Sequence, residues 1–187
     1  NLYQLLSDVS PKNCQEALHD ALTLRNDLLS QFNLGLVSIE HRALADTIFW
    51  ALMNKIREAT KDLHFVPDDL EKVPSYLIDT YFCNFSVFQS LPDSWAIEQI
   101  FPIAPIHRLE QEPTERVVLA DITCDSDGKI DRFPDLRDVK HYLPAHKFSN
   151  SSPYYFAAFF VGAYQEILGD LHNLFGDTNA VHVEVTS

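Results

Sequence analysis

The segment Asp121-Ile122-Thr123-Cys124-Asp125-Ser126-Asp127-Gly128 sets one cysteine among carboxylates at the point where an apolar run ends. That run, residues 117 to 123, has the β-branched and aliphatic composition of a strand. Farther along, Gly162-Ala163-Tyr164 ends a second apolar run. Because side chains that do chemistry often lie where a strand gives way to a loop, the two motifs predict part of an active site on a β-rich domain. The groups that would complete such a site are not evident in this chain.

Around these motifs, three more stretches have the alternation or the apolar run that indicates a β-strand. They are residues 83 to 87, 154 to 161 and 181 to 185. The second is apolar throughout, which predicts a strand buried on both faces. We also expect a helix over residues 163 to 174, ended by Gly176, and a long loop over residues 135 to 153.

The first third of the chain has a helical period instead. Apolar residues recur every three or four positions up to Gly35, and a second such series follows Ser38, a residue typical of a helix N-cap. The short link predicts two antiparallel neighbours. We therefore predict an α+β protein in which residues 1–66 form a helical bundle segment, residues 67–187 form a β-domain, and residues 68 to 78 are a turn-rich helical connector.

Composition limits the partners and the cellular compartment that we expect for this protein. A formal net charge of -13 and a pI of about 4.8 exclude a nucleic-acid partner, because nucleic-acid affinity depends on Lys and Arg that neutralise phosphates. The apolar runs are shorter than the ~20 residues of a membrane-spanning helix, so no membrane contact is expected. Three widely spaced cysteines favour a reducing, cytoplasmic compartment. The first residue is Asn1, and we expect the chain to be a piece of a longer protein.

The acidic stretch around Gly128 does not fit an EF-hand, because Thr123 and Pro134 would occupy the positions of the first Asp and the last Glu. A divalent ion such as Mg2+ in another geometry remains an alternative. Cys124 can be a small buried hydrophobe or a chemical group. Adjacent carboxylates raise a thiol pKa, which suits a thiol that keeps its proton and donates it as a general acid. The same carboxylates could receive a cationic substrate.

Several of these segments carry a family resemblance. Thr123 to Gly128 and Gly162-Ala163-Tyr164 resemble motifs in the C-terminal β-domain of pyridoxal-phosphate-dependent basic amino-acid decarboxylases, the group related to ornithine and diaminopimelate decarboxylases. The longer stretches Tyr81 to Trp95 and Gly162 to Asp177 resemble the bacterial arginine decarboxylases of that group. The helical pair is similar to an insertion that these enzymes carry.

The resemblance implies a β-barrel or β-sandwich of the alanine racemase and ornithine decarboxylase type, and a role for each motif residue. Cys124 would be catalytic, protonating the substrate α-carbon in the partner subunit's site. Asp125 and Asp127 would bind the basic end of the substrate. Tyr164 would contact the phosphate of pyridoxal 5'-phosphate. His172 falls where relatives place an aromatic residue near the shared site, and it would contact substrate.

The resemblance also implies what lies outside this chain. The N-terminal (β/α)8 barrel, with the lysine that binds the cofactor, and a C-terminal tail are absent from it. The expected function is to form part of a homodimeric or larger enzyme that converts L-arginine to agmatine and carbon dioxide for polyamine synthesis, and the chain alone would be inactive. Two alternatives remain: a decarboxylase of ornithine, lysine or diaminopimelate, or a non-catalytic regulatory homologue.

Overall fold

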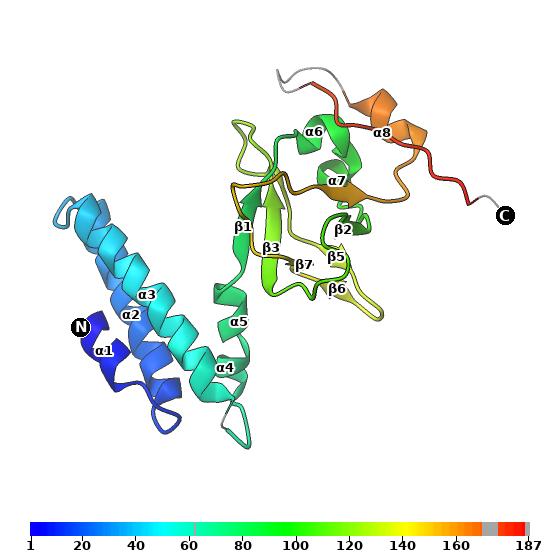
Figure 1. Cartoon of the computed structure of the whole chain (residues 1–187). Coiled ribbons are helices and arrows are strands. Elements are labelled where there is room, and N and C mark those ends of the chain that lie inside the picture. Colours follow the sequence, from blue (N-terminus) through cyan, green and yellow to red (C-terminus); the bar gives the residue numbers. More distant parts are fainter. Residues whose placement is uncertain (62, 170–175, 186–187) are drawn as a thin grey trace. The chain divides into compact units, whose positions relative to one another are not determined.

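The chain folds as two compact units, Asn1–Leu77 and Ile78–Ser187. The structure is a computed structural model that describes residues 1–61, 63–169 and 176–185 (Figure 1). Helices make up the first unit, and short strands and helices make up the second. Each unit has its own apolar core.

Two long helices dominate the first unit. They are α2 (Cys14–Asn33) and α3 (Ile39–Thr60), preceded by α1 (Leu2–Asp8). The turn between the long helices uses Gly35 at a φ of +72°, which only glycine adopts without strain, and α3 begins where the Ser38 hydroxyl accepts a hydrogen bond from the His41 amide. The predicted antiparallel helical pair is therefore confirmed.

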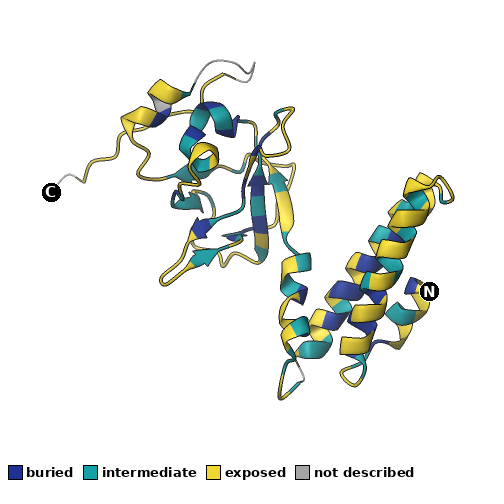
Figure 2. Cartoon of the chain, turned by 180° about the vertical axis from the view of Figure 1, so that it is seen from behind, coloured by how far each residue is buried: buried dark blue, intermediate teal, exposed yellow. Residues whose placement is uncertain are grey.

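The apolar core of the first unit continues to Val73, which explains why the unit extends to Leu77. One stripe of α3, formed by Phe49, Leu52, Met53 and Ile56, is fully buried (Figure 2). Two short helices, α4 (Asp68–Glu71) and α5 (Val73–Tyr76), add Leu70 and Val73 to the same cluster. Because these side chains pack with the long helices, the first unit runs to Leu77, later than the expected boundary after residue 66.

The second unit is built around β3 (Glu115–Ala120). Its partners are β1 (Asp79–Phe82), which runs parallel to it, and β4 (Lys129–Ile130) and β7 (Leu143–Ala145), which run antiparallel. Two small ribbons accompany this sheet. One pairs β2 (Ile103–Pro105) with β8 (Phe156–Ala158), and the other pairs β5 (Phe133–Pro134) with β6 (Val139–Lys140).

Three short helices complete the second unit: α6 (Val87–Ser90), α7 (Pro92–Ala96) and α8 (Ala163–Leu168). Val87 of α6 packs into the core with Val117 and Leu119 of β3. Among the described residues, no helix is both long and apolar enough to cross a bilayer. The mixed helical and sheet class is as predicted.

Several strand predictions were wrong. Residues 83 to 87 form no strand, because β1 ends at Phe82 and the chain turns into α6, where Ser86 caps the helix by accepting from the Gln89 amide. The predicted strand 154 to 161 is reduced to β8, which is half-buried rather than covered on both faces. Residues 181 to 185 are exposed and pair with none of the described strands.

The remaining segments also differ from prediction. The strand predicted over residues 117 to 123 is present as β3, although it ends at Ala120. The segment 135 to 153, predicted as a loop, contains β6 and β7. Helix α8 ends at Leu168, and residues 170 to 175 lie outside the described part of the chain.

Candidate functional site

The candidate site begins at Asp121, the first residue after β3. Its side chain is only 5% exposed. One carboxylate oxygen accepts hydrogen bonds from the Thr123 amide at 3.1 Å and the Thr123 hydroxyl at 2.8 Å, and the other accepts from the Val87 amide at 2.9 Å. One buried carboxylate thus joins the end of β3, the following loop and the start of α6.

The loop from Asp121 to Gly128 is closed at its base. The Asp121 amide donates to the Gly128 carbonyl at 2.7 Å, and the Gly128 amide donates to the Asp125 carbonyl at 3.2 Å. A Cβ on Gly128 would lie 2.0 Å from an oxygen of the Asp121 carboxylate, so only glycine fits there. The backbone therefore returns against Asp121 and enters β4.

Cys124 lies in this loop as an exposed free thiol. Thr123 and Asp125, on either side of it, are fixed by hydrogen bonds: the Asp125 amide lies 3.5 Å from the Thr123 hydroxyl, and the Asp125 carboxylate accepts from the Asp127 amide at 2.9 Å. The sequence predictions that concern Cys124, Asp125 and Asp127 thus fall on one solvent-facing loop.

A shallow pocket of about 190 Å3 lies beside the loop. Asp127 and Lys129 line one part of it, and Trp95 and Glu98 line another. Lys129 is paired with Asp131 at 2.7 Å, and this hydrogen-bonded carboxylate raises the pKa of the lysine ammonium. Glu98 pairs with Arg132. The pocket therefore carries charges of both signs next to the acidic loop.

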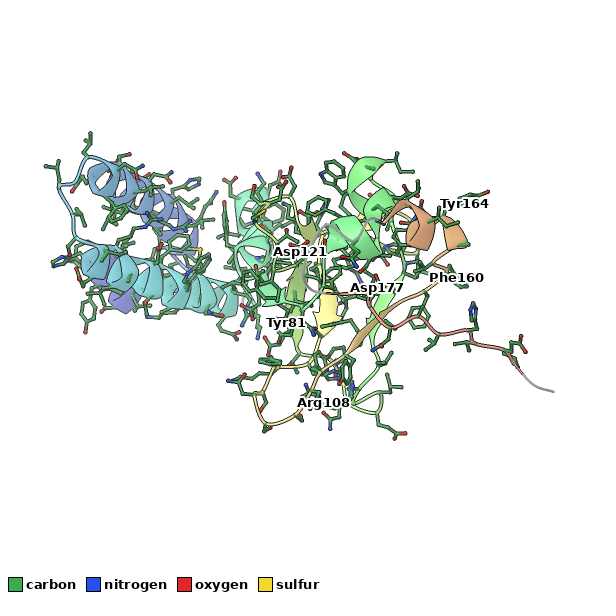
Figure 3. All side chains as sticks on the ribbon, turned by 90° about the horizontal axis from the view of Figure 1, so that it is seen from above. Tyr81, Arg108, Asp121, Phe160, Tyr164 and Asp177 are labelled. Carbon is green, nitrogen blue, oxygen red and sulfur yellow. The ribbon has the colours of Figure 1, made fainter. Side chains whose placement is uncertain are left out.

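Tyr164 lies on a separate element, in the first turn of α8. Its side chain is 75% exposed and projects away from Asp121 (Figure 3). The helix is held by Gln165, which is buried and exchanges hydrogen bonds with the Asp93 amide and carboxylate at the start of α7. Gly169 then passes so close to the Gln89 carbonyl that a Cβ would lie 1.9 Å from its oxygen.

The structure does not test the predicted role of His172, and its described residues contain no preformed metal site. His172 lies outside the described residues, so its predicted place near substrate stays a prediction. Within the described residues, no group of three or more His, Cys, Asp or Glu side chains is placed to hold a metal ion, and in the acidic loop the Asp125 carboxylate accepts from the Asp127 amide.

Sequence reasoning missed Asp121 and Gln165 as the residues that hold the two motifs. The signal for Asp121 was present in its position: a carboxylate directly after a strand, two residues before a threonine, is able to close a turn onto the threonine amide and hydroxyl. The contacts across the fold, from Asp121 to Val87 and from Gln165 to Asp93, had no local signal.

Comparison with known proteins identifies the family. Residues 1–74 match the model of the arginine decarboxylase helical bundle domain. Over 186 residues the chain is 55% identical to the biosynthetic arginine decarboxylase of Thermosynechococcus vestitus, and over 184 residues it is 51% identical to that of Bacteroides thetaiotaomicron. The chain belongs to the biosynthetic arginine decarboxylase family.

A solved structure agrees with the sequence relatives. The structure of the biosynthetic arginine decarboxylase SpeA from Campylobacter jejuni matches with a TM-score of 0.66 at 36% sequence identity, covering 92% of this chain and 27% of that one. The two relatives named above are matched over 100% and 98% of this chain but over only 29% of their own length. The chain therefore spans less than a third of the proteins that it resembles.

Proposed function

We propose that this chain is part of a pyridoxal-phosphate-dependent decarboxylase that converts L-arginine to agmatine and carbon dioxide, a step towards polyamines. The observation that carries the proposal is the identity of 50 to 55% with several proteins named biosynthetic arginine decarboxylase, over nearly all of this chain. The chain would supply the helical bundle and a β-barrel or β-sandwich domain of the alanine racemase type. The (β/α)8 barrel and a C-terminal tail would come from the rest of the protein.

The described residues fit this cofactor only at one point. Tyr164 presents an exposed hydroxyl that hydrogen-bonds to no other described residue, and a phenol donor suits a phosphate oxygen. We infer that Tyr164 contacts the cofactor phosphate and that the lysine that binds the cofactor belongs to the absent barrel. The cofactor would accept the electron pair that is left when carbon dioxide departs.

Cys124 would complete the reaction as a proton donor. When the bond between the α-carbon and the carboxylate breaks, carbon dioxide leaves without the electron pair of that bond. The S–H bond of Cys124 then breaks as a C–H bond forms at the α-carbon, and solvent returns a proton to the thiolate. The exposed position of the thiol in its loop supports this role, because a buried thiol could not meet a substrate.

Asp125 and Asp127 would bind the guanidinium end of the substrate. Both are exposed carboxylates on the loop that carries Cys124. A carboxylate suits this task because it pairs with a guanidinium through two parallel hydrogen bonds. His172, outside the described residues, remains a proposed contact near the shared site.

We further propose a homodimer or larger homo-oligomer in the cytoplasm, with each site shared between subunits. Such sharing is consistent with the separation of the motifs, because Tyr164 lies on α8 and projects away from Asp121, the residue that begins the loop with Cys124 (Figure 3). We also propose Mg2+ as an accessory ion.

Substrate preference tests the proposal. Full-length protein with pyridoxal phosphate should release agmatine from L-arginine and act far more slowly on ornithine, lysine and diaminopimelate. A preference for ornithine, lysine or diaminopimelate would support decarboxylation as the reaction but contradict arginine as the substrate. Absence of turnover on all four would favour the regulatory alternative.

A further inference from the structure

We infer that Asp121 is a positioning residue for Cys124, and that Thr123 transmits its effect. This inference rests on the proposed role of Cys124 as the proton donor. Neither Asp121 nor Thr123 would touch substrate. Their task would be to hold the peptide segment on both sides of the thiol in one place, so that the proton reaches the α-carbon rather than another atom.

Asp121 has anchors outside the loop as well as within it. Its backbone continues β3, where Cys83 donates to the Ala120 carbonyl at 2.8 Å. Its side chain accepts from the Val87 amide at 2.9 Å, at the start of α6. The bond from Val87 ties the Asp121 carboxylate to α6, in addition to its two bonds from Thr123 in the loop.

Asp121 is connected to both neighbours of Cys124. The carboxylate oxygen that receives the Thr123 amide also receives the Thr123 hydroxyl, at 2.8 Å. The same hydroxyl oxygen faces the Asp125 amide at 3.5 Å. Hydrogen bonds therefore connect the buried carboxylate to the residue before the thiol and, through the hydroxyl, to the residue after it.

Proton delivery to carbon depends on the donor lying within a fraction of an ångström of its productive place, and an exposed loop does not ensure this without support. A carboxylate can accept three hydrogen bonds at once, whereas an asparagine amide must turn one N–H group towards a donor. Aspartate at position 121 can therefore accept all three hydrogen bonds, whereas asparagine would lose at least one of them.

The test uses the full-length enzyme and measures the share of turnovers on L-arginine that give a carbonyl compound instead of agmatine. If the thiol were misplaced, the α-carbon would not receive the proton, and water would instead release the carbon chain of the substrate as a carbonyl compound, supplying its oxygen and leaving the amino nitrogen with the cofactor. We expect Thr123→Val and Asp121→Asn each to raise the share of carbonyl product at least tenfold, and Thr123→Ser to restore the wild-type share. Hydrogen exchange of cofactor-free protein should show at least tenfold faster exchange at Asp125 in Thr123→Val and wild-type rates in β1.

A control separates positioning from general destabilisation. Tyr154 bonds the amide and ring of His146, next to β7, which pairs with the start of β3 and not with its end. Tyr154→Phe should therefore lower stability without changing the share of carbonyl product. If Asp121→Asn does not fold, the comparison of Thr123→Val with Thr123→Ser still tests the inference.

The outcomes separate this inference from the proposed function. If Cys124→Ala gives carbonyl product and Thr123→Val does not, the inference is wrong and the role of Cys124 stands. If Cys124→Ala gives only agmatine at the wild-type rate, the role of Cys124 is wrong and the inference falls with it.

Discussion

At the scale of single residues, Gly128 lies so close to the Asp121 carboxylate that a side chain at position 128 would displace it. Gly128→Ala should push the Asp121 carboxylate from its three hydrogen bonds, because the added Cβ would lie 2.0 Å from one of its oxygens. We expect a loss of about 1–3 kcal/mol in the free energy of unfolding, measured by chemical denaturation. Gly162→Ala is the matched control, since nothing lies within 4 Å of that position, and it should cost less than about 1 kcal/mol. Equal losses in the two variants would contradict the packing argument.

The three thiols should also differ in reactivity. Burial raises the pKa of the Cys83 thiol to about 11 and Cys14 is buried, whereas Cys124 is exposed. At pH 8 we expect iodoacetamide to label Cys124 at least tenfold faster than Cys83, as measured by mass spectrometry of the peptides. Labelling of Cys83 at the rate of Cys124 would show that the segment around β1 is open.

The raised pKa of Cys83 has a consequence for stability. A thiol ionises near pH 8.5 in an unfolded chain, whereas folded Cys83 holds its proton up to about pH 11. The folded state therefore binds more protons between these values, and the stability contributed by Cys83 should decline as the pH rises from about 9 to 11. Cys83→Ala should weaken this decline when unfolding is measured across that range.

At the scale of elements, the N-cap of α3 gives a defined expectation. The Ser38 hydroxyl accepts from the His41 amide and also lies 2.9 Å from the His41 ring nitrogen. Ser38→Ala should lower the free energy of unfolding by about 1 kcal/mol. Ser30→Ala is the control, because the Ser30 hydroxyl only bonds the Asn26 carbonyl within α2, and its effect should stay within about 0.5 kcal/mol. Similar losses would mean that the cap contributes nothing specific.

The same elements show what could be predicted from sequence. The long helices were predictable because their signals are local: apolar spacing, Ser38 and Gly35. The start of α6 was not, since Cys83, Phe85 and Val87 alternate like a strand, and the Val87 amide is held instead by Asp121, far along the chain. The loop from Asp121 to Gly128 could be located from sequence, but the hydrogen bond that joins the Asp121 carboxylate to α6 depends on the fold.

Residues 181 to 185 illustrate a second limit. Their alternation predicts a strand, but a strand needs a partner, and none of the described strands pairs with them. The relatives are more than three times as long as this chain, so alternation alone could not show which segment, if any, provides the pairing.

At the scale of the whole molecule, the second unit exposes a group of apolar side chains on and before α8. It consists of Phe159, Phe160, Val161, Tyr164, Ile167 and Leu168, all exposed by 40% or more. Because such a patch is unfavourable in water, we expect the isolated chain to self-associate as its concentration rises. Phe160→Asn should reduce the association, since Phe160 is 90% exposed and its φ of 59° suits asparagine. A monomer at every concentration in light scattering would contradict this expectation.

We propose that this chain supplies the proton donor of an arginine decarboxylase. The most direct measurement is agmatine formation from L-arginine by the full-length protein with pyridoxal phosphate, comparing wild type with Cys124→Ala and running ornithine and lysine alongside. We predict turnover that is selective for arginine and that falls sharply, or gives carbonyl product, without Cys124. Turnover that does not depend on Cys124, or no turnover on any basic amino acid, would contradict the claim.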